Sequence, residues 1–293
     1  MSNSIKQFKF KSGAKLQVEV VPLKTLMDVN KAHLISPHRT DFYHIFLFDN
    51  CNPSHLVDFK IVEVKPYSLL FINKDRVHQF DQLKKYVGSL IIFTEDFFCR
   101  TQHDLHYLRH SVLFNDLTDK PDLPLSKPQY EKFKKLSIEI DEESKNPDNQ
   151  TKHNILKNLV HNFLLYAEQE KQYTGVEEVK RGSDYNTVLQ FRDLLDVHFI
   201  ESKNVGFYSE QLNISEKKLG KSTFAVFGKT PKILIDERII LEAKRLLVHE
   251  RQSVKEIGFN LGFEETTNFI KYFRKHTNKT PLEFRESYLT RKQ

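Results

Sequence analysis

Part of the C-terminal third of this chain occurs twice. Residues 212–216 (LNISE) recur in type as residues 261–265 (LGFEE), 49 positions later, and residues 228–231 (GKTP) recur as residues 278–281 (NKTP), 50 positions later. In each copy a short helix-forming segment precedes a turn, and a second such segment ends before Lys-Thr-Pro. A pattern repeated at a fixed offset indicates a repeated structural unit, so the sequence predicts two units of helix, tight turn and helix.

The second copy carries clear signals for the two ends of its first helix. Ser253 and Glu256 form a capping box, in which each side chain accepts a hydrogen bond from the backbone N–H of the other residue. Gly262 supplies the left-handed conformation that ends the helix, and Asn213 takes this place in the first copy because asparagine tolerates positive φ. The helix between these signals has an apolar stripe of Val254, Ile257 and Leu261.

The second helix of each copy has an apolar face and a polar face. Phe263, Phe269 and Phe273 fall on the face that packs against the first helix. The outward residues are Thr266, Thr267, Ile270 and Lys271 in the second copy and Lys217, Lys218, Gly220 and Lys221 in the first. This pattern is typical of helix-turn-helix proteins, whose second helix enters the major groove of DNA. Residues 231–248 are predicted to form a rigid spacer helix that holds the two units about one turn of DNA, ~34 Å, apart.

The positive charge of the chain is concentrated in this region. Residues 181–293 contain 20 Lys and Arg against 15 Asp and Glu, whereas residues 1–180 contain 25 against 24. Lys and Arg neutralise phosphates, so the distribution fits a nucleic-acid-binding domain joined to a near-neutral one. The charge alone fits a solvated, mildly basic surface equally well.

The sequence also excludes several classes of protein. Cys51 and Cys99 lie far apart and without metal-ligand spacing, which argues against a disulfide framework or a zinc finger and suits a reducing compartment. No apolar run approaches the ~18 residues of a membrane span, and the first 15 residues lack the apolar stretch of a signal peptide. We therefore expect a cytoplasmic protein that has no membrane partner.

The first half of the chain is predicted to be mainly β-structure. Short runs of β-branched and aromatic residues alternate with turn residues, a spacing typical of a β-barrel or sandwich. The expected strands are residues 16–21, 43–48, 56–64, 69–72 and 89–93.

Helical periodicity follows in residues 129–145 and 151–171. These two helices are expected either to form a two-fold dimer contact or to cover the end of the barrel. The sequence thus predicts an α+β multidomain protein with a first domain at residues 1–171, a linker at 172–184 and an all-α domain at 185–293.

The C-terminal residues closely resemble the AraC/XylS family of bacterial regulators. The resemblance covers residues 185–288 and is most specific at residues 253–263 (SVKEIGFNLGF), at residues 268–275 (NFIKYFRK) and at Thr280-Pro281. It implies base contacts from Lys217, Gly220, Lys221, Thr266, Thr267 and Lys271 on double-stranded DNA. It implies phosphate contacts from Lys229, Arg274, Lys275 and Lys279.

The first copy departs from the family pattern. Thr223, Phe224 and Ala225 stand where such proteins usually have a Phe-Lys-Lys-like run, so two cations are lost and the phosphate contacts there are expected to be weaker. Asn278 replaces the usual glycine, which is a mild change because asparagine tolerates positive φ.

The N-terminal half resembles, less specifically, the cupin-type sensor domain that often accompanies this DNA-binding module. The resemblance places His38, Tyr43, His44 and His78 on strands that line a cavity, where they are expected to contact a small-molecule effector. The three histidines are the right type of ligand for a metal, but the glutamate and glycines of metal-binding cupins are absent, and structural hydrogen bonding is a further explanation. We expect no metal, no cofactor and no catalytic residue.

The sequence therefore predicts a sequence-specific transcription factor that responds to an effector, forms a homodimer and is able to contact RNA polymerase. One alternative is a metal-dependent cupin enzyme with an accessory DNA-binding tail, which predicts stoichiometric metal. A second is a nucleoid-type protein without sequence preference, which predicts a strong salt dependence and little effect of Lys271 on discrimination.

Overall fold

The computed structural model describes residues 6–10, 17–114, 121–173 and 183–289. Contacts between Cα atoms divide the chain between residues 177 and 178. The part before this point is called the N-terminal unit and the part after it the C-terminal unit, and each is described by itself. The predicted linker, 172–184, encloses the division, although residues 174–182 lie outside the described part.

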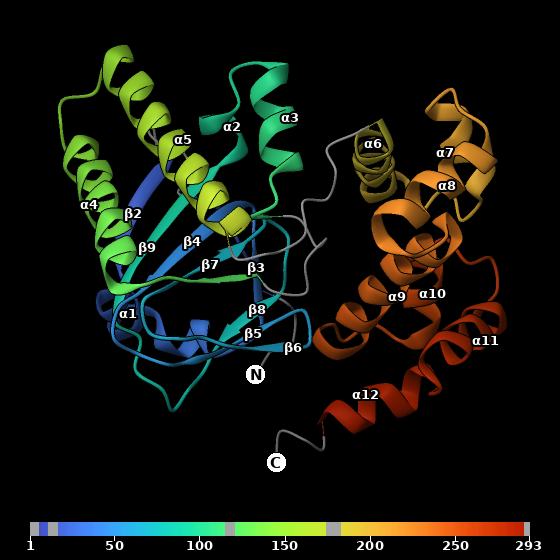
Figure 1. The fold of residues 1–293 in the computed structure, drawn as a ribbon. Coiled ribbons are helices and arrows are strands. Elements are labelled where there is room, and N and C mark those ends of the chain that lie inside the picture. The colour runs from blue at the N-terminus through green and yellow to red at the C-terminus, as the bar shows by residue number, and fades with distance from the viewer. Residues whose placement is uncertain (1–5, 11–16, 115–120, 174–182, 290–293) are drawn as a thin grey trace. The chain divides into compact units, whose positions relative to one another are not determined.

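The N-terminal unit contains two five-stranded sheets (Figure 1). The strand order is β1-β3-β8-β5-β6 in the first sheet and β10-β7-β4-β9-β2 in the second. Pairing is antiparallel except between β1 and β3. The first sheet consists of β1 (Lys6–Phe8), β3 (His38–Thr40), β8 (His78–Phe80), β5 (Ser54–Val57) and β6 (Lys60–Glu63), and the second of β10 (Asp122–Pro124), β7 (Ser68–Ile72), β4 (Phe42–Phe48), β9 (Gly88–Thr94) and β2 (Val18–Pro22).

The central strand β4 is buried on both faces. Successive side chains of a strand point to opposite sides of the sheet. Phe46 and Phe48 pack with Phe80 between the two sheets, whereas Tyr43, Ile45 and Leu47 belong to a second core on the other side. This explains why residues 42–48 (FYHIFLF) form a nearly continuous apolar run instead of alternating with polar residues.

Helices cover the outer face of the second sheet. α4 (Lys127–Ser144) and α5 (Gln150–Tyr173) lie across it, and their buried residues include Phe133, Val160 and Phe163 (Figure 1). The periodicity of residues 129–145 and 151–171 predicted both helices. α1 (Leu23–Leu34), α2 (Glu95–Phe98) and α3 (Gln102–His110) were not predicted.

Residues 56–64 do not form the single strand expected from the sequence. β5 and β6 pair as a hairpin, and Asp58 and Phe59 form its two-residue turn with φ of 43° and 69°. The Asp58 carboxylate accepts hydrogen bonds from Arg76 and from the Val77 N–H, which fixes the turn from outside the hairpin. The usual Asn-Gly signal for such a turn is absent, so local sequence alone did not indicate it. The other four predicted strands correspond to β2, β4, β7 and β9, although residue 16 lies outside the described part.

Every regular element among the described residues of the C-terminal unit is a helix (Figure 1). Its helices are α6 (Ser183–His198), α7 (Val205–Gln211), α8 (Glu216–Phe227), α9 (Pro231–His249), α10 (Val254–Asn260), α11 (Thr266–Thr277) and α12 (Pro281–Leu289). The mixed fold, with sheets first and helices after, agrees with the sequence prediction.

Two helices extend into the two ends of the predicted linker. α5 continues to Tyr173 and α6 begins at Ser183, so residues 172, 173, 183 and 184 are helical. Among the described helices, none combines the length and the apolar character needed to cross a membrane.

α9 is more than the spacer helix that the sequence predicts. Ile235, Ile239 and Leu247 are buried in the core of the C-terminal unit, together with apolar residues from α6, α7, α8, α10 and α11. Thr230 caps the start of the helix, and Pro231 occupies its first turn, where a missing N–H has no cost. α9 is therefore the central helix against which the two duplicated helix pairs pack.

Candidate nucleic-acid interface

The two helix pairs, α7–α8 and α10–α11, have the same turn geometry. In the first pair the Asn213 N–H donates to the carbonyl of Glu210 (2.9 Å) and the Ile214 N–H to that of Ser209 (3.0 Å). In the second pair the same bonds join Gly262 to Phe259 (2.9 Å) and Phe263 to Gly258 (3.0 Å). Asn213 and Gly262 are left-handed, with φ of 54° and 71°. Both helices thus end in a Schellman motif, as the duplication predicted.

Apolar side chains fix the second helix of each pair. Phe269 and Phe273 are fully buried on α11, and Leu219 is fully buried on α8. Ser215 caps α8 through the Lys218 N–H, and Ser253 and Glu256 form the expected capping box on α10. The packed face and the helix starts therefore agree with the sequence prediction.

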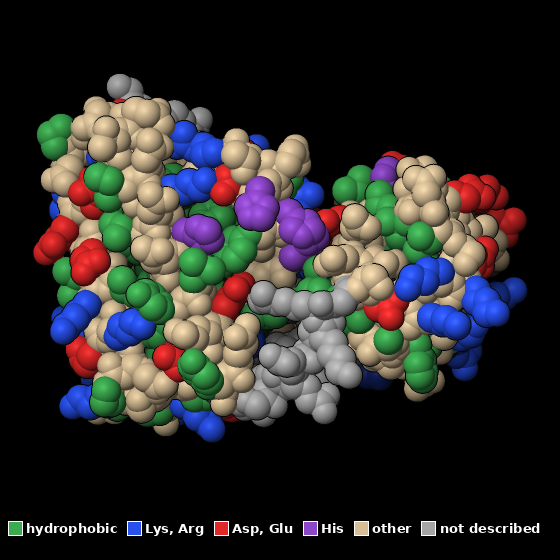
Figure 2. Space-filling view, turned by 45° about the horizontal axis from the view of Figure 1, so that its top comes forward, with side chains coloured by type: hydrophobic (Ala, Val, Ile, Leu, Met, Phe, Trp, Pro, Cys, Tyr) green, Lys and Arg blue, Asp and Glu red, His purple; other side chains and the backbone are tan. Residues whose placement is uncertain are grey.

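The outward faces of α8 and α11 carry the six residues expected to contact bases. Lys217, Lys221, Thr267 and Lys271 are exposed, while Gly220 and Thr266 are partly exposed. Figure 2 shows Lys and Arg side chains gathered on part of the surface of the C-terminal unit. The structure thus presents donors and cations along both helices, which is what contact with base edges and phosphates requires.

The four residues expected to contact phosphates differ in their surroundings. Arg274, Lys275 and Lys279 are exposed at the C-terminal end of α11 and just beyond it. Lys229 is only partly exposed, and its Nζ lies 2.7 Å from Glu237 of α9. A phosphate at Lys229 would therefore compete with this carboxylate.

An aspartate outside each pair holds the second helix. Asp184 on α6 accepts hydrogen bonds from Lys218 (2.6 Å) and Ser222 (2.7 Å) of α8. Asp236 on α9 accepts one from the Tyr272 hydroxyl of α11 (2.7 Å). Ser222 and Tyr272 occupy matching positions at the 50-residue offset. In both copies the helix that precedes the pair therefore supplies a carboxylate to this position, although Asp184 and Asp236 themselves are not at matching positions.

The second aspartate has further partners. Its carboxylate is also 2.6 Å from Lys232 and 3.2 Å from the Nε2 atom of His276 on α11. Burial and the bond to Asp236 raise the pKa of Tyr272 well above its usual range. Tyr272 therefore remains a neutral donor, and the contact holds α11 at all physiological pH values.

The N-terminal unit contains a buried cluster of four histidines. His38, His44 and His78, all predicted to share a site, lie with His55 between the two sheets. The ring of His78 is central, with centroid distances of 4.2 Å to His38, 4.7 Å to His44 and 5.3 Å to His55. The Nε2 atom of His55 lies 3.1 Å from the Nδ1 atom of His78.

Burial favours the neutral form of these imidazoles. Burial and neighbouring histidines lower the pKa of His44 to about 3, and burial lowers that of His38 and His55 to about 4 and about 3. The pKa of His78 is also lowered well below its usual value, by burial and by the other three histidines. Among the described residues, none is a hydrogen-bond partner for Nδ1 of His44, Nδ1 of His55 or Nε2 of His78.

Tyr43 does not belong to this cluster, although the sequence grouped it with His44. Adjacent residues of a strand point to opposite faces, so Tyr43 packs under the helices, where it stacks with Phe93 and donates to Glu95. The sequence did not predict His55 as a site residue, because the expected strand began at residue 56, one residue after His55. The hairpin of β5 and β6 was also not expected. The structure therefore replaces Tyr43 with His55 in the candidate interior site.

Within the described ranges, no group of three or more His, Cys, Asp or Glu side chains is arranged to hold a metal ion. The imidazole rings instead contact one another and Phe46 and Phe80.

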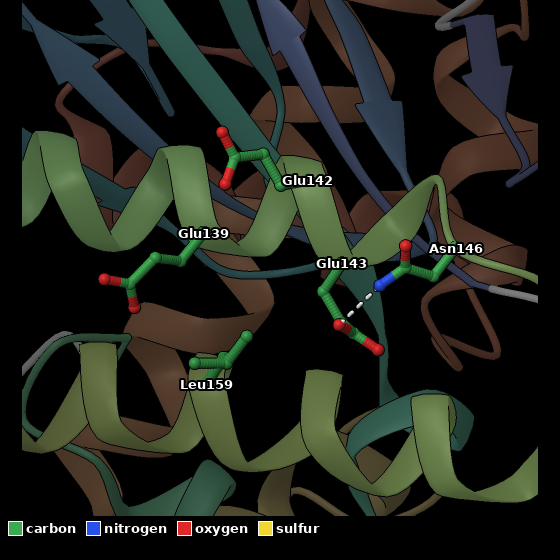
Figure 3. Close-up of a pocket in the computed structure, with 5 residues that line it drawn as sticks. All are labelled: Glu139, Glu142, Glu143, Asn146 and Leu159. Carbon is green, nitrogen blue, oxygen red and sulfur yellow. Dashed lines mark hydrogen bonds between the residues drawn. The ribbon is translucent and has the colours of Figure 1, made fainter.

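A hollow of about 470 Å³ lies on the outside of the helix pair α4–α5. It is lined by Glu139, Glu142 and Glu143 of α4, by Asn146 and by Leu159 of α5 (Figure 3). The Asn146 side chain donates to Glu143 (2.8 Å). None of the buried histidines lines this hollow, so it is separate from the candidate site between the sheets.

Comparisons with known proteins agree with the geometry of the C-terminal unit. A family model described as a helix-turn-helix domain matches residues 208–287. The HTH-type transcriptional activator RhaS of Escherichia coli O139:H28 (strain E24377A / ETEC) is 28% identical over 92 residues, which are 31% of this chain and 33% of the relative. The chain thus matches about one third of the length of this curated relative.

Two solved structures are also similar to the chain. An AraC-type transcriptional regulator from Chromobacterium violaceum is 22% identical, with a TM-score of 0.33, and the match covers 35% of this chain and 92% of that one. A structure of ToxT from Vibrio cholerae is 14% identical, with a TM-score of 0.41, and the match covers 93% of this chain and 98% of that one.

The packed helix pairs, the exposed basic faces and the matching family model define the C-terminal unit as a helix-turn-helix DNA-binding domain. The curated relative that matches this region is itself an HTH-type transcriptional activator, which agrees with the resemblance of these residues to the AraC/XylS family. These matches give no support to the alternative of a metal-dependent enzyme.

Proposed function

We propose that this chain regulates transcription by binding a specific double-stranded DNA sequence through both helix pairs of its C-terminal unit. The observation that carries the proposal is the repetition of one turn geometry at Asn213 and Gly262, each followed by a helix with an exposed polar face. The residues proposed to contact bases are Lys217, Gly220 and Lys221 on α8 and Thr266, Thr267 and Lys271 on α11. A protein that reads chromosomal DNA in this way would act in the cytoplasm of a bacterium.

Phosphate contacts would set the position of the protein on the duplex. Arg274, Lys275 and Lys279 surround the exposed end of α11, which supports the role proposed for them. At the end of α8 the proposed contact is Lys229, which is paired with Glu237. We therefore expect α11 to contribute more of the salt-dependent affinity than α8.

Selection of binding sites from random duplex DNA tests this function. The full-length protein is expected to enrich a motif with two blocks about one helical turn apart. Lys271→Ala is expected to relax one block and to weaken binding to the selected site about tenfold, since a bidentate base contact is worth roughly 1–3 kcal/mol. Lys145→Ala removes the same charge at the residue that follows α4 and serves as the matched control.

Two outcomes would contradict the proposal. If no motif is enriched, the helix pairs do not read sequence, and a nucleoid-type role without sequence preference becomes the better explanation. If Lys271→Ala and Lys145→Ala behave alike, α11 does not contact base edges in the proposed way.

We further propose that the space between the sheets takes a small polar effector. The support is the three unpartnered ring nitrogens on His44, His55 and His78, because a buried polar atom without a partner costs about 1–3 kcal/mol. A ligand that accepts or donates hydrogen bonds there would recover part of this cost. If this ligand controls DNA binding, the affinity of the protein for the ligand must differ between the free and the DNA-bound states.

A screen of small polar metabolites by thermal shift would find such an effector, and His78→Leu is the variant that should lose the shift. Phe80→Leu alters the same interior without removing a ring nitrogen and serves as the control. Equal affinity for the effector in the presence and absence of operator DNA would contradict a regulatory role.

We also propose that α4 and α5 form a homodimer contact. Ile138, Ile155 and Tyr166 remain exposed although the opposite sides of both helices are buried against the second sheet. Sedimentation equilibrium tests this contact, and Ile138→Glu with Ile155→Glu should shift the protein toward the monomer. Contact with RNA polymerase stays a prediction from the family resemblance.

A further inference from the structure

The exposed face of α8 contains an aromatic side chain that its duplicate lacks. Phe224 is 65% exposed and lies at the position that Arg274 takes on α11, while Ala225 corresponds to Lys275. Relative to the family pattern, this difference removes two cations. The structure shows in addition that the phenyl ring faces solvent and is not part of the core that fixes α8.

A glycine lies one turn before this ring on the same side of the helix. Residues four positions apart are neighbours on a helix surface, so Gly220 lies beside Phe224. A Cβ atom added at Gly220 would meet nothing within 4 Å. Glycine inside a helix is less favourable than alanine, and packing of the core does not require it at this position. The glycine instead leaves open space beside the phenyl ring.

The surroundings of this surface point to DNA. Lys217 and Lys221 are exposed on the same helix, Lys221 one turn before Phe224. Cations beside an apolar side chain match the major groove, where phosphates border the bases and the C5 methyl of thymine is the apolar group. A protein partner for this face would have to be acidic around an apolar contact and would exclude DNA from α8.

We propose that Phe224 contacts the C5 methyl group of a thymine in the half-site read by α8, with Gly220 giving the base pair room to approach. This inference rests on the proposed function and adds a specificity-determining residue to it. α8 then obtains discrimination from an apolar contact, whereas α11 relies more on charged side chains.

The test combines one protein substitution with one change in the DNA. After site selection, each thymine of the half-site assigned to α8 is replaced in turn by deoxyuridine, which removes only the methyl group. For the wild-type protein, one replacement should weaken binding about fourfold, the ratio expected for one buried methyl group. For Phe224→Ala the same replacement should have no effect.

Phe259→Ala is the matched control. Phe259 is an exposed phenylalanine on α10 and lies outside the proposed contact, so this variant should keep the fourfold response. Gly220→Ala gives an independent measurement. It is expected to raise the melting temperature while weakening binding to the selected site, because its methyl group fills the open space.

The results separate this inference from the function on which it rests. An equal deoxyuridine response in the wild-type protein and in Phe224→Ala would overturn the methyl contact while leaving a defined motif intact. Unchanged DNA affinity of Gly220→Ala would also count against it. Failure of the wild-type protein to select any motif would overturn the proposed function itself.

Discussion

Gly262 and Asn213 occupy the same position in the two duplicated turns but tolerate substitution differently. A Cβ atom at Gly262 would lie 2.2 Å from the carbonyl oxygen of Ile200, so no larger residue fits without movement of the backbone. Asn213 is exposed and accommodates its side chain at the same left-handed conformation. The second turn is therefore tied to the segment before α7 by close backbone packing, whereas the first turn accommodates a side chain.

This difference predicts unequal effects of alanine at the two turns. Gly262→Ala should lower the free energy of unfolding by more than the roughly 1–2 kcal/mol that a left-handed conformation costs an ordinary residue, because the clash adds to that cost. Asn213→Ala should cost no more than this amount, and Asn213→Gly should be neutral or stabilising. Denaturant unfolding of the full chain measures all three variants, and equal losses for the two alanine variants would contradict the packing argument.

At the scale of elements, each outward helix is held by a carboxylate from the helix that precedes its pair. On α8 this carboxylate engages a cation, because Asp184 lies 2.6 Å from Lys218. The hydrogen bonds from Lys218 and Ser222 lower the pKa of Asp184, so it stays charged at neutral pH. Asp184 thus neutralises one of the lysines nearest to the proposed DNA surface.

Asp184→Asn is expected to release Lys218 for phosphate contact. Affinity for DNA should rise at low salt. The slope of log affinity against log salt concentration should become steeper, by up to the amount expected for about one additional phosphate contact. Asp196→Asn removes the same charge from α6 but breaks a pair with Arg238 of α9, so it should leave the salt dependence unchanged. Binding titrations over a range of salt concentrations decide this, and identical curves for the two variants would rule out the effect.

At the scale of the whole molecule, the histidine cluster ties the stability of the N-terminal unit to pH. The ordinary pKa of a histidine is 6.5, whereas burial lowers the pKa of His38 to about 4 and that of His44 and His55 to about 3. Below pH 6.5 the unfolded chain therefore binds more protons than the folded unit. The stabilising contribution is complete above pH 6.5 and is lost as pH falls toward 4.

The free energy of unfolding should consequently fall as pH is lowered from 6.5 to 4, by as much as about 1.4 kcal/mol per pH unit for each buried histidine. His55→Leu should reduce the slope of the free energy of unfolding against pH by about the contribution of one histidine. Phe80→Leu should lower the free energy of unfolding but leave this slope unchanged. Urea unfolding at several pH values tests the prediction. Parallel pH curves for the wild-type protein and His55→Leu would show that the cluster does not cause the dependence.

The sequence alone predicted the features that depend on neighbouring residues. The Schellman turns at Asn213 and Gly262 and the capping box at Ser253 follow from hydrogen bonds within a few positions. The buried Phe269 and Phe273 followed from helical periodicity. These local signals occur in both copies of the duplicated segment. Most of the C-terminal unit and the outward faces of its helices could therefore be predicted.

Only the tertiary structure decided features that depend on contacts between distant segments. In the tertiary structure His55 belongs to the histidine cluster, whereas Tyr43 lies on the other side of β4. Strand pairing and register decide which side of β4 faces the other sheet. The tertiary structure also placed α9 at the centre of the helical core and joined Asp184 to α8 across more than thirty residues. Such partners are chosen by packing in space, and no local pattern in the sequence encodes them.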